Sequence, residues 1–586
     1  MCGIAGIMVR DGKSPDASIL ETFARALGHR GPDGEGKYLA GAVAMVQTRL
    51  AVIDLKTGDQ PIYEAGGGAL IANAEIYNYL ELRATLGDIP QSTQSDCEPP
   101  LHLYRRDGLS FTDSLRGMYA IAIHDPAKAQ LILARDPFGI KPLYYVETED
   151  HFAFASEPQA LLAAGVAAPE LAPERRNELL QLQFTCGRGT IFKGINRVLP
   201  GETLIVRGGR IVERRRRTAL PAGGPEECGM DEGLRRLDAA LEDSVLLHQR
   251  SDVPYGLFLS GGIDSSTMLA LMSRLNERPV KAYTAGFSGT AVADERDHAR
   301  ELVKTVGAEF HAVDFTDADF WSLLPEIAGA MDDPAADYAI LPTWKLAREA
   351  ARDLKVVISG EGGDELLGGY GRYRSALRPW WQGGRMMRAR GIVEGLGILR
   401  EDSASWRDAI AASEVTATEP QRSRLQIAQA VDITDWLPND LLTKLDRCLM
   451  AHGMEGRTPF LDTQVAKAVF RLPDSLKIHK QRGKWILRRW LDRVLPAAGA
   501  FERKRGFTVP VGEWIFERGA ELGPLVAANP AIAEACHSDR VIALFKSTKK
   551  RARLAGWVLL FYALWHCQHV QRRQPEGDVF DVLSTI

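Results

Sequence analysis

The chain has 586 residues, which is too long for one hydrophobic core, so we expect two or more domains. Its 72 basic and 76 acidic residues leave a formal charge of -4, which argues against a nucleic-acid partner held mainly through phosphate contacts. A hydrophobic content of 45% fits a soluble globular enzyme, and seven scattered cysteines without a CxxC pair favour free thiols in a reducing compartment.

The first residues do not form a signal peptide, because they lack a basic segment and a long apolar core. The most apolar later stretch, residues 556–565, is too short to span a bilayer and predicts a core helix. These features predict a cytoplasmic protein without a membrane segment.

Cys2 is the first candidate for chemistry, because a single residue precedes it. If Met1 is removed, Cys2 carries both a thiol and an α-amine that titrates near pH 8 and can act as the base for that thiol. Nucleophile and base then belong to one residue, as in N-terminal nucleophile hydrolases. A cysteine at position two can also be incidental.

The N-terminal part continues with apolar and alternating segments that predict strands, among them residues 118–123, 131–134 and 204–206. The arginine-rich and Pro/Gly-rich run at 211–230 predicts an exposed linker. An amphipathic pattern over residues 231–248 then predicts the helix that opens a second domain.

Residues 255–274 combine a short apolar strand, the turn Ser-Gly-Gly-Ile-Asp-Ser-Ser at 260–266 and a helix that we expect to be capped by hydroxyls. Glycines allow a ligand to approach the backbone, and the N–H groups of a helix N-terminus attract anions, so the turn predicts a phosphate site. Asp264 can hold the magnesium that accompanies a nucleotide. A tight strand-to-helix connection without a ligand is the plainer interpretation.

A second turn of the same design follows residues 355–358, with the sequence Ser-Gly-Glu-Gly-Gly-Asp-Glu at 359–365. Strands that alternate with helices up to residue 360 predict a doubly wound parallel sheet. Ligands of such sheets bind beyond the carboxyl ends of the strands, so the two turns could bracket one nucleotide. Asp264 and Asp364 would then approach the same metal ion.

These motifs together resemble the family of glutamine-hydrolysing asparagine synthetases, and the loop at 260–266 resembles the pyrophosphate loop of the ATP-pyrophosphatases. The N-terminal segments 29–34, 48–54, 73–78 and 95–98 carry the same resemblance, which covers roughly residues 1–520. It implies a two-domain α/β and α+β architecture. An N-terminal nucleophile hydrolase αββα sandwich would occupy residues 1–210, a linker 211–230, and a doubly wound synthetase domain with extra C-terminal helices 231–586.

In the N-terminal domain the resemblance implies a glutaminase site in which Cys2 is the nucleophile. Arg49 would meet the glutamine α-carboxylate and Asp96 the α-ammonium, with Asn73 and Glu75 also in the glutamine site. The amide of Asn73 and the N–H of Ala74 would form the oxyanion hole. Ala74 stands where glycine is usual, and a positive φ there would strain it, so altered glutaminase activity is conceivable.

In the second domain the resemblance implies a nucleotide site. Its residues would be Phe258, Ser260, Gly261, Gly262, Asp264, Ser265, Ser266, Ala285, Ser359 and Gly360. Phe258 and Ala285 would lie against the adenine. Lys484 would reach the phosphates and stabilise departing pyrophosphate.

Glu361 would act beside the reaction centre, because ammonia that attacks an acyl-adenylate must lose protons. The matching residue of the related β-lactam-forming synthetases is tyrosine, so glutamate here favours amide synthesis from ammonia. A helix-capping role for Glu361 is compatible with this. The segments 437–447, 454–462 and 504–507 also resemble the family, and Gly456 stands where valine is usual.

The implied enzyme uses ATP and Mg²⁺, glutamine and aspartate, and an internal channel for ammonia. An amidotransferase for another carboxylate, such as a peptide, a cell-wall acid or a small acid, has the same chemistry. A protein that has lost synthetase activity and senses glutamine is the alternative from another class, and the intact acidic residues and Lys484 argue against it. A homodimer is compatible with the sequence, which does not decide the oligomeric state.

Overall fold

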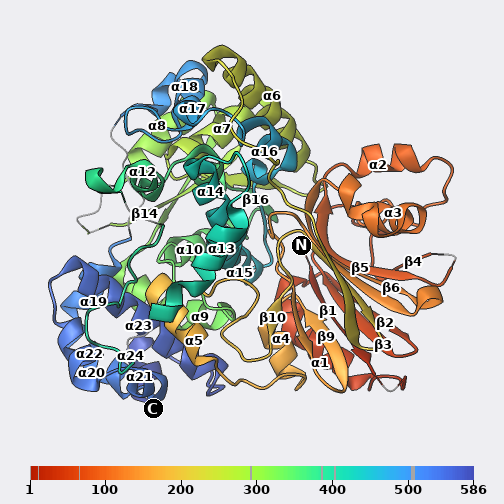
Figure 1. The fold of residues 1–586 in the computed structure, drawn as a ribbon, viewed down its shortest axis with the longest axis horizontal. Helices are drawn as coiled ribbons and strands as arrows, with labels where there is room; N and C mark the ends of the chain where they lie inside the picture. The colour runs from red at the N-terminus through yellow and green to blue at the C-terminus, as the bar shows by residue number, and fades with distance from the viewer. Residues whose placement is uncertain are drawn as a thin grey trace.

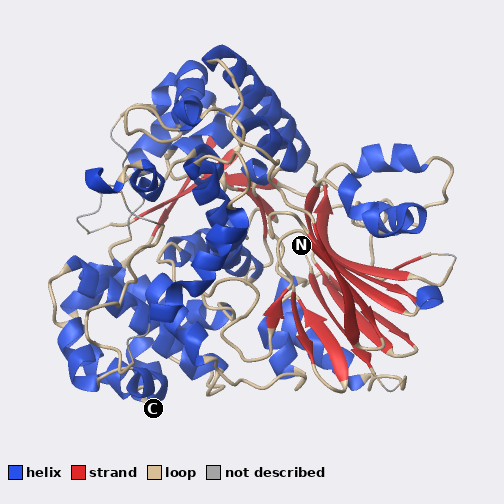
Figure 2. Cartoon of the chain, in the orientation of Figure 1, coloured by secondary structure: helices blue, strands red, loops and turns tan. Residues whose placement is uncertain are grey.

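The computed structural model describes residues 2–10, 12–64, 66–288, 290, 294–384, 387–401, 404–502 and 509–585. The chain folds into two lobes that lie side by side (Figure 1): a β-rich lobe from the N-terminal part and a larger lobe with helices around a short sheet. Figure 2 shows the long strands concentrated in the first lobe. The segment 504–507 lies outside the described residues.

The N-terminal lobe contains two six-stranded sheets in which the paired strands run antiparallel. The first sheet has the order β10 (Asn196–Arg197), β8 (Tyr144–Glu147), β9 (His151–Ala155), β1 (Gly3–Val9), β3 (Val43–Arg49) and β2 (Gly34–Ala40). The second has the order β12 (Arg210–Arg216), β11 (Glu202–Arg207), β7 (Gln130–Arg135), β6 (Gly117–Asp125), β5 (Ala69–Ile76) and β4 (Ile62–Tyr63). The strands predicted at 118–123, 131–134 and 204–206 are confirmed.

The two sheets pack face to face, and helices cover their outer faces. Apolar residues of both sheets, such as Ile4 and Met45 with Ile71 and Leu133, form the core between them. Helices α1 (Ser18–Leu27) and α4 (Pro158–Ala163) pack on the first sheet, and α2 (Tyr79–Leu86) and α3 (Pro99–Asp107) on the second. The predicted αββα sandwich is therefore confirmed.

The arginine-rich run after residue 210 differs from the prediction of a linker. Residues 210–216 form β12, an edge strand that pairs with β11 and is largely exposed. Exposed positive charges on an edge strand oppose pairing with another chain. Because β12 lacks the apolar alternation that marks a half-buried strand, its sequence resembled a loop.

The larger lobe is built around a five-stranded parallel sheet. Its order is β15 (Glu309–Asp314), β14 (Lys281–Gly286), β13 (Tyr255–Phe258), β16 (Val356–Ile358) and β17 (Glu455–Arg457). The chain moves outward from β13 to β15 in one direction and then from β16 to β17 in the other, so the predicted doubly wound sheet is confirmed. The order reverses between β13 and β16, and such a switch point is where ligands bind in these folds.

The helices of this lobe surround the sheet and include the predicted amphipathic helix as α6. In chain order they are α6 (Met230–His248), α7 (Ile263–Leu275), α8 (Arg296–Val306), α9 (Asp317–Ala330), α10 (Ile340–Ala350), α11 (Gly363–Leu367), α12 (Gly371–Leu377), α13 (Asp408–Ala417), α14 (Arg424–Val431), α15 (Leu442–Met450), α16 (Thr463–Val469), α17 (Asp474–Lys477) and α18 (Trp485–Val494). A further helix, α5 (Pro173–Leu182), lies between the lobes in Figure 1.

The C-terminal helices form a bundle around α23 (Lys550–His569). The others are α19 (Val511–Glu517), α20 (Gly519–Ala528), α21 (Pro530–Ala535), α22 (Ser538–Phe545) and α24 (Val579–Ser584). Residues 555–565 of α23 are fully buried, so the predicted core helix is confirmed. Among the described residues, no helix combines the length and apolar composition needed to cross a bilayer.

The bundle has a structural role that the sequence did not indicate. The indoles of Trp557 and Trp565 donate to the backbone oxygens of Ala336 and Met331, 2.7 and 2.9 Å away. They fix the aspartate-rich segment 331–337 between the lobes.

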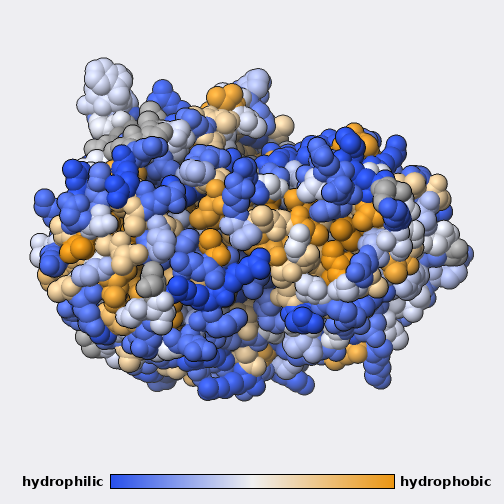
Figure 3. Space-filling model, turned by 90° about the horizontal axis from the view of Figure 1, so that it is seen from below, coloured by the Kyte–Doolittle hydropathy of each residue, from blue (hydrophilic) through white to orange (hydrophobic). Residues whose placement is uncertain are grey.

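The face of the molecule in Figure 3 is mostly hydrophilic, with hydrophobic residues in separate patches.

Candidate active sites

Cys2 lies directly before β1, and its side chain is buried. Its backbone nitrogen donates to Asn73 Oδ1 at 3.1 Å, and its backbone oxygen accepts from Arg30 Nε at 3.2 Å. Burial raises the pKa of the Cys2 thiol above its ordinary value. The thiol is therefore protonated at neutral pH, and nucleophilic attack needs a base.

Asn73 and Ala74 follow each other on β5 and offer two donors close to Cys2. The amide Nδ2 of Asn73 is buried and has no hydrogen-bond partner among the described residues. The N–H groups of Ala72 and Ile76 bond to Gln60 and Asp96 at the edge of β5 that faces away from β6. Because alternate N–H groups of a strand point the same way, the N–H of Ala74 faces that edge too.

Ala74 does not have the strained backbone that the sequence suggested. It is part of β5, opposite Tyr119 of β6. Its φ is not positive, unlike that of the few non-glycine residues in the left-handed region of the described chain. Alanine therefore fits this position without strain, and the reason for expecting altered glutaminase activity disappears.

We expect Ala74→Gly to leave glutamine hydrolysis within about twofold of the parent and to destabilise the protein by roughly 0.5–1 kcal/mol. A glycine in a strand interior loses more conformational freedom on folding than alanine and gains nothing where φ is negative. Glutaminase kinetics with denaturant unfolding would check both values. A large gain in glutaminase rate would contradict the unstrained backbone.

Arg49 and Asp96 lie near the same edge of the N-terminal lobe. Arg49 Nη1 donates to the carboxylate of the exposed Asp59 at 2.8 Å, so the guanidinium already binds a carboxylate. Asp96 is buried and accepts from the Ile76 N–H at 2.7 Å. Burial raises the pKa of Asp96 to about 6, against the lowering effect of this hydrogen bond.

The resemblance assigns Glu75 to the glutamine site, and in the structure its carboxyl group bonds to the other lobe. Arg457 of β17 donates through Nη2 to Glu75 Oε2 at 2.8 Å, and both side chains are buried. Arg457 also donates to the backbone oxygens of His248 and Arg250. Glu75 thus ties β5, the strand of Asn73 and Ala74, to the parallel sheet.

The first loop of the larger lobe closes between β13 and α7. Ser265 Oγ donates to the Gly262 oxygen at 3.1 Å and lies 3.1 Å from Ser260 Oγ. The N-cap of α7 is Gly262, without a side-chain cap, so the predicted hydroxyl capping is wrong. The hydroxyls of Ser260 and Ser265 instead bond within the loop, and the first N–H groups of α7 carry no side-chain cap.

The second loop meets the first at the switch point. A Cβ at Gly360 would lie 2.9 Å from Cβ of Asp264, and one at Gly363 would lie 2.5 Å from Asp264 Oδ1. Both distances are shorter than packed atoms allow, so a larger residue at either position would displace Asp264. The loop at 359–365 therefore lies directly against Asp264, as the two-turn design predicted.

Lys484 joins the two loops. Its ammonium lies 2.7 Å from Asp364 Oδ1 and also pairs with Asp264. Burial alone would lower the pKa of Lys484, but the two carboxylates raise it above its ordinary value, so the ammonium stays charged. Lys484 has a φ of 54°, a conformation that is uncommon for lysine. Such backbone strain is frequent at functional sites.

The Asp264 and Asp364 pair suits a hard cation. No cluster of three or more His, Cys, Asp or Glu side chains with metal-binding geometry occurs among the described residues. The two carboxylates already surround one cation, the Lys484 ammonium. Two carboxylates fit a magnesium ion that takes its other ligands from water and phosphate oxygens.

The remaining residues predicted to bind the nucleotide lie around the ends of β13, β14 and β16. Phe258 ends β13 and belongs with the buried Ala285 of β14 to one apolar cluster. Ser359 follows β16 and donates its N–H to the Arg457 oxygen at 2.8 Å. Ser266 is fully buried in the first turn of α7.

Glu361 follows Gly360 and is partly exposed at the same loop. Its Oε1 lies 3.1 Å from Lys444 Nζ, and that lysine is 3.7 Å from Asp337 Oδ2. Burial opposes the charge of Lys444, but Glu361 and Asp337 raise its pKa above the ordinary value. Lys444 is a partner of Glu361 that the sequence did not reveal.

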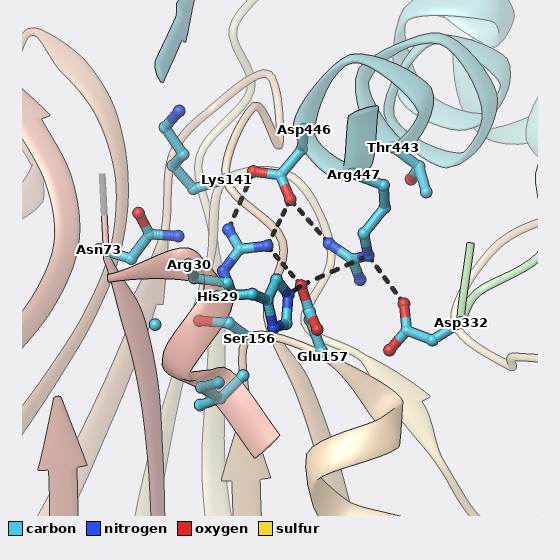
Figure 4. Close-up of polar contacts among 12 residues, drawn as sticks. His29, Arg30, Asn73, Lys141, Ser156, Glu157, Asp332, Thr443, Asp446 and Arg447 are labelled. Carbon is cyan, nitrogen blue, oxygen red and sulfur yellow. Dashed lines mark hydrogen bonds and ion pairs between the residues drawn. The ribbon is translucent and has the colours of Figure 1, made fainter. Parts of the chain in front are cut away.

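A buried network of charged side chains between the lobes also escaped the sequence. We call Arg30, Glu157, Asp332, Asp446 and Arg447 the interlobe network (Figure 4). Figure 4 shows Asp446 and Arg447 pointing from α15 toward Arg30 and Glu157 of the N-terminal lobe. The available signal was charged residues within the apolar segment 441–450, which indicates burial in pairs.

Two family models match the chain. Residues 236–567 match the model described as asparagine synthase, and residues 1–216 match the glutamine amidotransferase domain. The order of the two matches is the order of the two lobes.

Relatives align over most of the chain. Asparagine synthetase [glutamine-hydrolyzing] 1 of Bacillus subtilis is 31% identical over 98% of this chain and 98% of its own length. A putative asparagine synthetase [glutamine-hydrolyzing] of Mycobacterium tuberculosis is 33% identical over 95% of this chain and 94% of its own. Asparagine synthetase [glutamine-hydrolyzing] 2 of Bacillus subtilis is 30% identical over 84% of this chain and 70% of its own.

Proposed function

The chain belongs to the asparagine synthase family, and on this premise we propose that it makes L-asparagine from L-aspartate, ATP and the amide nitrogen of glutamine. AMP, pyrophosphate and glutamate are the other products. The observation that carries the proposal is the meeting of Asp264, Asp364 and Lys484 at the switch point, on a chain that also holds Cys2 beside the amide of Asn73.

In the glutaminase half-reaction Cys2 Sγ attacks the side-chain amide carbon of glutamine. After removal of Met1, the Cys2 nitrogen is the α-amine, which Asn73 Oδ1 already holds and which accepts the thiol proton. The Asn73 amide and the Ala74 N–H stabilise the oxyanion. The proton passes to the leaving nitrogen as the C–N bond breaks, and water then hydrolyses the thioester to glutamate.

Arg49 and Asp96 hold the two charged ends of glutamine in this proposal. The guanidinium of Arg49 exchanges the Asp59 carboxylate for the α-carboxylate of the substrate. Asp96 pairs with the α-ammonium. Glu75 holds its strand in register with the second lobe through Arg457.

In the synthetase half-reaction the β-carboxylate of aspartate attacks the α-phosphorus of ATP, and pyrophosphate leaves. The loop at 260–266 and the N-terminus of α7 bind the phosphates, and Lys484 neutralises the departing pyrophosphate. Mg²⁺ held by Asp264 and Asp364 would supply further positive charge at these oxygens. Ammonia attacks the adenylate carbon, AMP leaves, and Glu361 accepts a proton.

Ammonia must cross from Cys2 to Glu361 inside the protein, because in neutral water it would become unreactive ammonium.

All seven cysteines carry free thiols, which supports a cytoplasmic location. The near balance of charge supports small-molecule substrates and no nucleic-acid partner.

The test is a panel of carboxylic acids with ATP and ammonium, with AMP, pyrophosphate and the amide product measured. We expect aspartate to give the highest rate of AMP formation, with asparagine in equal amount. A peptide or another acid with a much higher kcat/KM would keep the chemistry and replace the acceptor. If no acid of the panel supported ATP-dependent AMP formation, the proposal would be overturned.

Glutamine binding should weaken as the pH falls through about 6, because Asp96 then loses the charge that meets the α-ammonium. The pKa of Asp96 is raised by burial, so the carboxyl is ionised above about 6 and neutral below it. In a Cys2→Ala background, which prevents hydrolysis, calorimetry should show Kd rising by up to about tenfold per pH unit below 6. The double variant Cys2→Ala/Asp96→Asn should bind glutamine weakly at every pH. A Kd that does not change with pH in the Cys2→Ala protein would show that Asp96 does not bind the α-ammonium.

A further inference from the structure

The helix α15 is buried along its whole length and lies between the two active sites. It packs on β17 at Gly456, where an added Cβ would lie 3.3 Å from the side chain of Leu445 and 3.6 Å from that of Leu449. The missing side chain of Gly456 lets the helix approach the sheet closely. Because packed interiors resist compression, a displacement at one end of α15 reaches the rest of the helix.

One face of α15 reaches the glutaminase site through Asp446. Its two carboxylate oxygens accept from Arg30 Nη1 and Nη2 at 2.7 and 3.0 Å, and Arg30 also donates to the backbone oxygen of Cys2. Burial alone would raise the pKa of Asp446, but Arg30 and Arg447 hold it below the ordinary value. A single arginine thus connects the backbone of the nucleophile to the helix with a bidentate, charged bond.

The opposite face of α15 reaches the synthetase site through Lys444. Residues two positions apart on a helix are about 200° apart around its axis, so Lys444 and Asp446 point in opposite directions. Lys444 Nζ lies 3.1 Å from Glu361 Oε1. The contacts therefore run from Cys2 through Arg30, Asp446 and Lys444 to Glu361.

The other members of the interlobe network lie at the Arg30 and Asp446 end of this connection (Figure 4). Arg30 donates to Glu157 at 2.6 Å, and Arg447 donates to Asp446 and to Asp332, each at 2.7 Å. Asp332 accepts from the Gln159 N–H of α4 at 3.0 Å. Side chains of Arg30 and Arg447 are at most 1% exposed, and breaking such a buried pair is costly, so the network favours one discrete arrangement.

We propose that Asp446 is a positioning residue that couples the two half-reactions through α15, an inference that rests on the proposed function. When Cys2 becomes acylated or aspartate becomes adenylated, the contacts of Arg30 or Lys444 change, and α15 passes the change to the other site. Each site biases the same helix, so the state of one site affects the other. Aspartate and ATP should therefore accelerate glutamine hydrolysis, and Asp446 should be required for that acceleration.

The test compares Asp446→Asn with Asp333→Asn in the full-length enzyme. Asp333 accepts from Arg197 at 2.7 and 2.8 Å across the same interface, buried to the same degree, and neither residue touches Cys2 or Glu361 in the described structure. Each substitution removes one buried charge and keeps the shape. The readouts are glutaminase kcat/KM with and without ATP and aspartate, and glutamate formed per pyrophosphate.

We expect Asp446→Asn to lower the acceleration by about fivefold or more, within the usual range of coupling energies, and to raise the glutamate-to-pyrophosphate ratio. Ammonia-driven synthesis and unstimulated hydrolysis should stay within about twofold of the parent. Asp333→Asn should leave acceleration and ratio unchanged. If Asp446→Asn does not fold at the assay temperature, Asp446→Glu, which displaces the carboxylate by one methylene, takes its place with the same expectation.

Two results would overturn the coupling role: an unchanged ratio in the Asp446 variant, or equal uncoupling by both variants, which would indicate a loosened interface. The parent enzyme separates this inference from the proposed function. If the parent lacks either half-reaction, the proposed function fails. If it performs both and the Asp446 variant stays coupled, only the role of α15 fails.

Discussion

Cys2→Ala should abolish glutamine-driven asparagine synthesis and leave ammonia-driven synthesis at the parental rate. The thiol is the atom that forms the thioester, and removal of a nucleophile lowers turnover by on the order of 10⁴-fold or more. The larger lobe keeps its loops, because Cys2 contacts Asn73 and Arg30 through backbone atoms that alanine retains. Asparagine formed from glutamine and from ammonium chloride, measured side by side, checks this result.

Cys97→Ala is the matched control for this change. Cys97 is also buried, and its thiol lies 3.8 Å from the Ala74 oxygen on the same edge of β5. Burial raises the pKa of the Cys97 thiol well above its ordinary value, and Cys97, unlike Cys2, has no α-amine to act as its base. Cys97→Ala should keep glutamine-driven synthesis. If Cys2→Ala lost asparagine synthesis from ammonium as well as from glutamine, the assignment of the two half-reactions to separate lobes would be wrong.

The features that could be predicted from the sequence are local ones. The segment at 255–274 holds its own strand signal, its glycines and its helix within twenty positions, so β13, the loop and α7 were predicted together. The two loops were expected to converge because parallel strands place their carboxyl ends at one edge of a sheet. Gly360 against Asp264 is the outcome of that rule.

The features that could not be predicted depend on distant contacts. Arg30 and Asp446 are 416 positions apart, and Glu75 and Arg457 are 382 apart, so neither sequence segment shows its partner. Ala74 was compared with a family glycine, whereas its conformation follows from pairing with Tyr119. The arginines of β12 resembled a linker because an exposed edge strand has no apolar face.

The position of Glu361 between the loops and α15 explains why its charge should matter late in the reaction. Gly360 brings the backbone against Asp264, and Lys444 orients the Glu361 carboxylate from the side of α15. Lys484 instead pairs with Asp264 and Asp364, and the proposed mechanism gives it the phosphate chemistry. In the proposed mechanism, adenylation and attack by ammonia therefore depend on different residues of one site.

Glu361→Gln should stop amide formation and spare adenylation. A glutamine cannot accept the proton that ammonia loses, and general-base catalysis contributes about 10²–10⁴-fold, so asparagine formation from either nitrogen source should fall by that factor. Aspartate-dependent exchange of pyrophosphate into ATP should stay within a few fold, because Lys484 and the loops are unchanged. Glutaminase turnover at Cys2 should persist. Exchange and amide formation are measured on the same preparation.

Glu365→Gln, in the helix that begins at the same loop, is the matched control. Burial and the neighbouring Asp364 raise the pKa of Glu365 to about 8, so its carboxyl is mostly protonated at neutral pH and resembles an amide already. Tyr370 donates to it at 2.8 Å, a bond that the glutamine oxygen can still accept. Glu365→Gln should therefore leave both activities near the parental level. If Glu361→Gln lost exchange together with amide formation, Glu361 would serve nucleotide binding, and the assignment of the proton to it would be wrong.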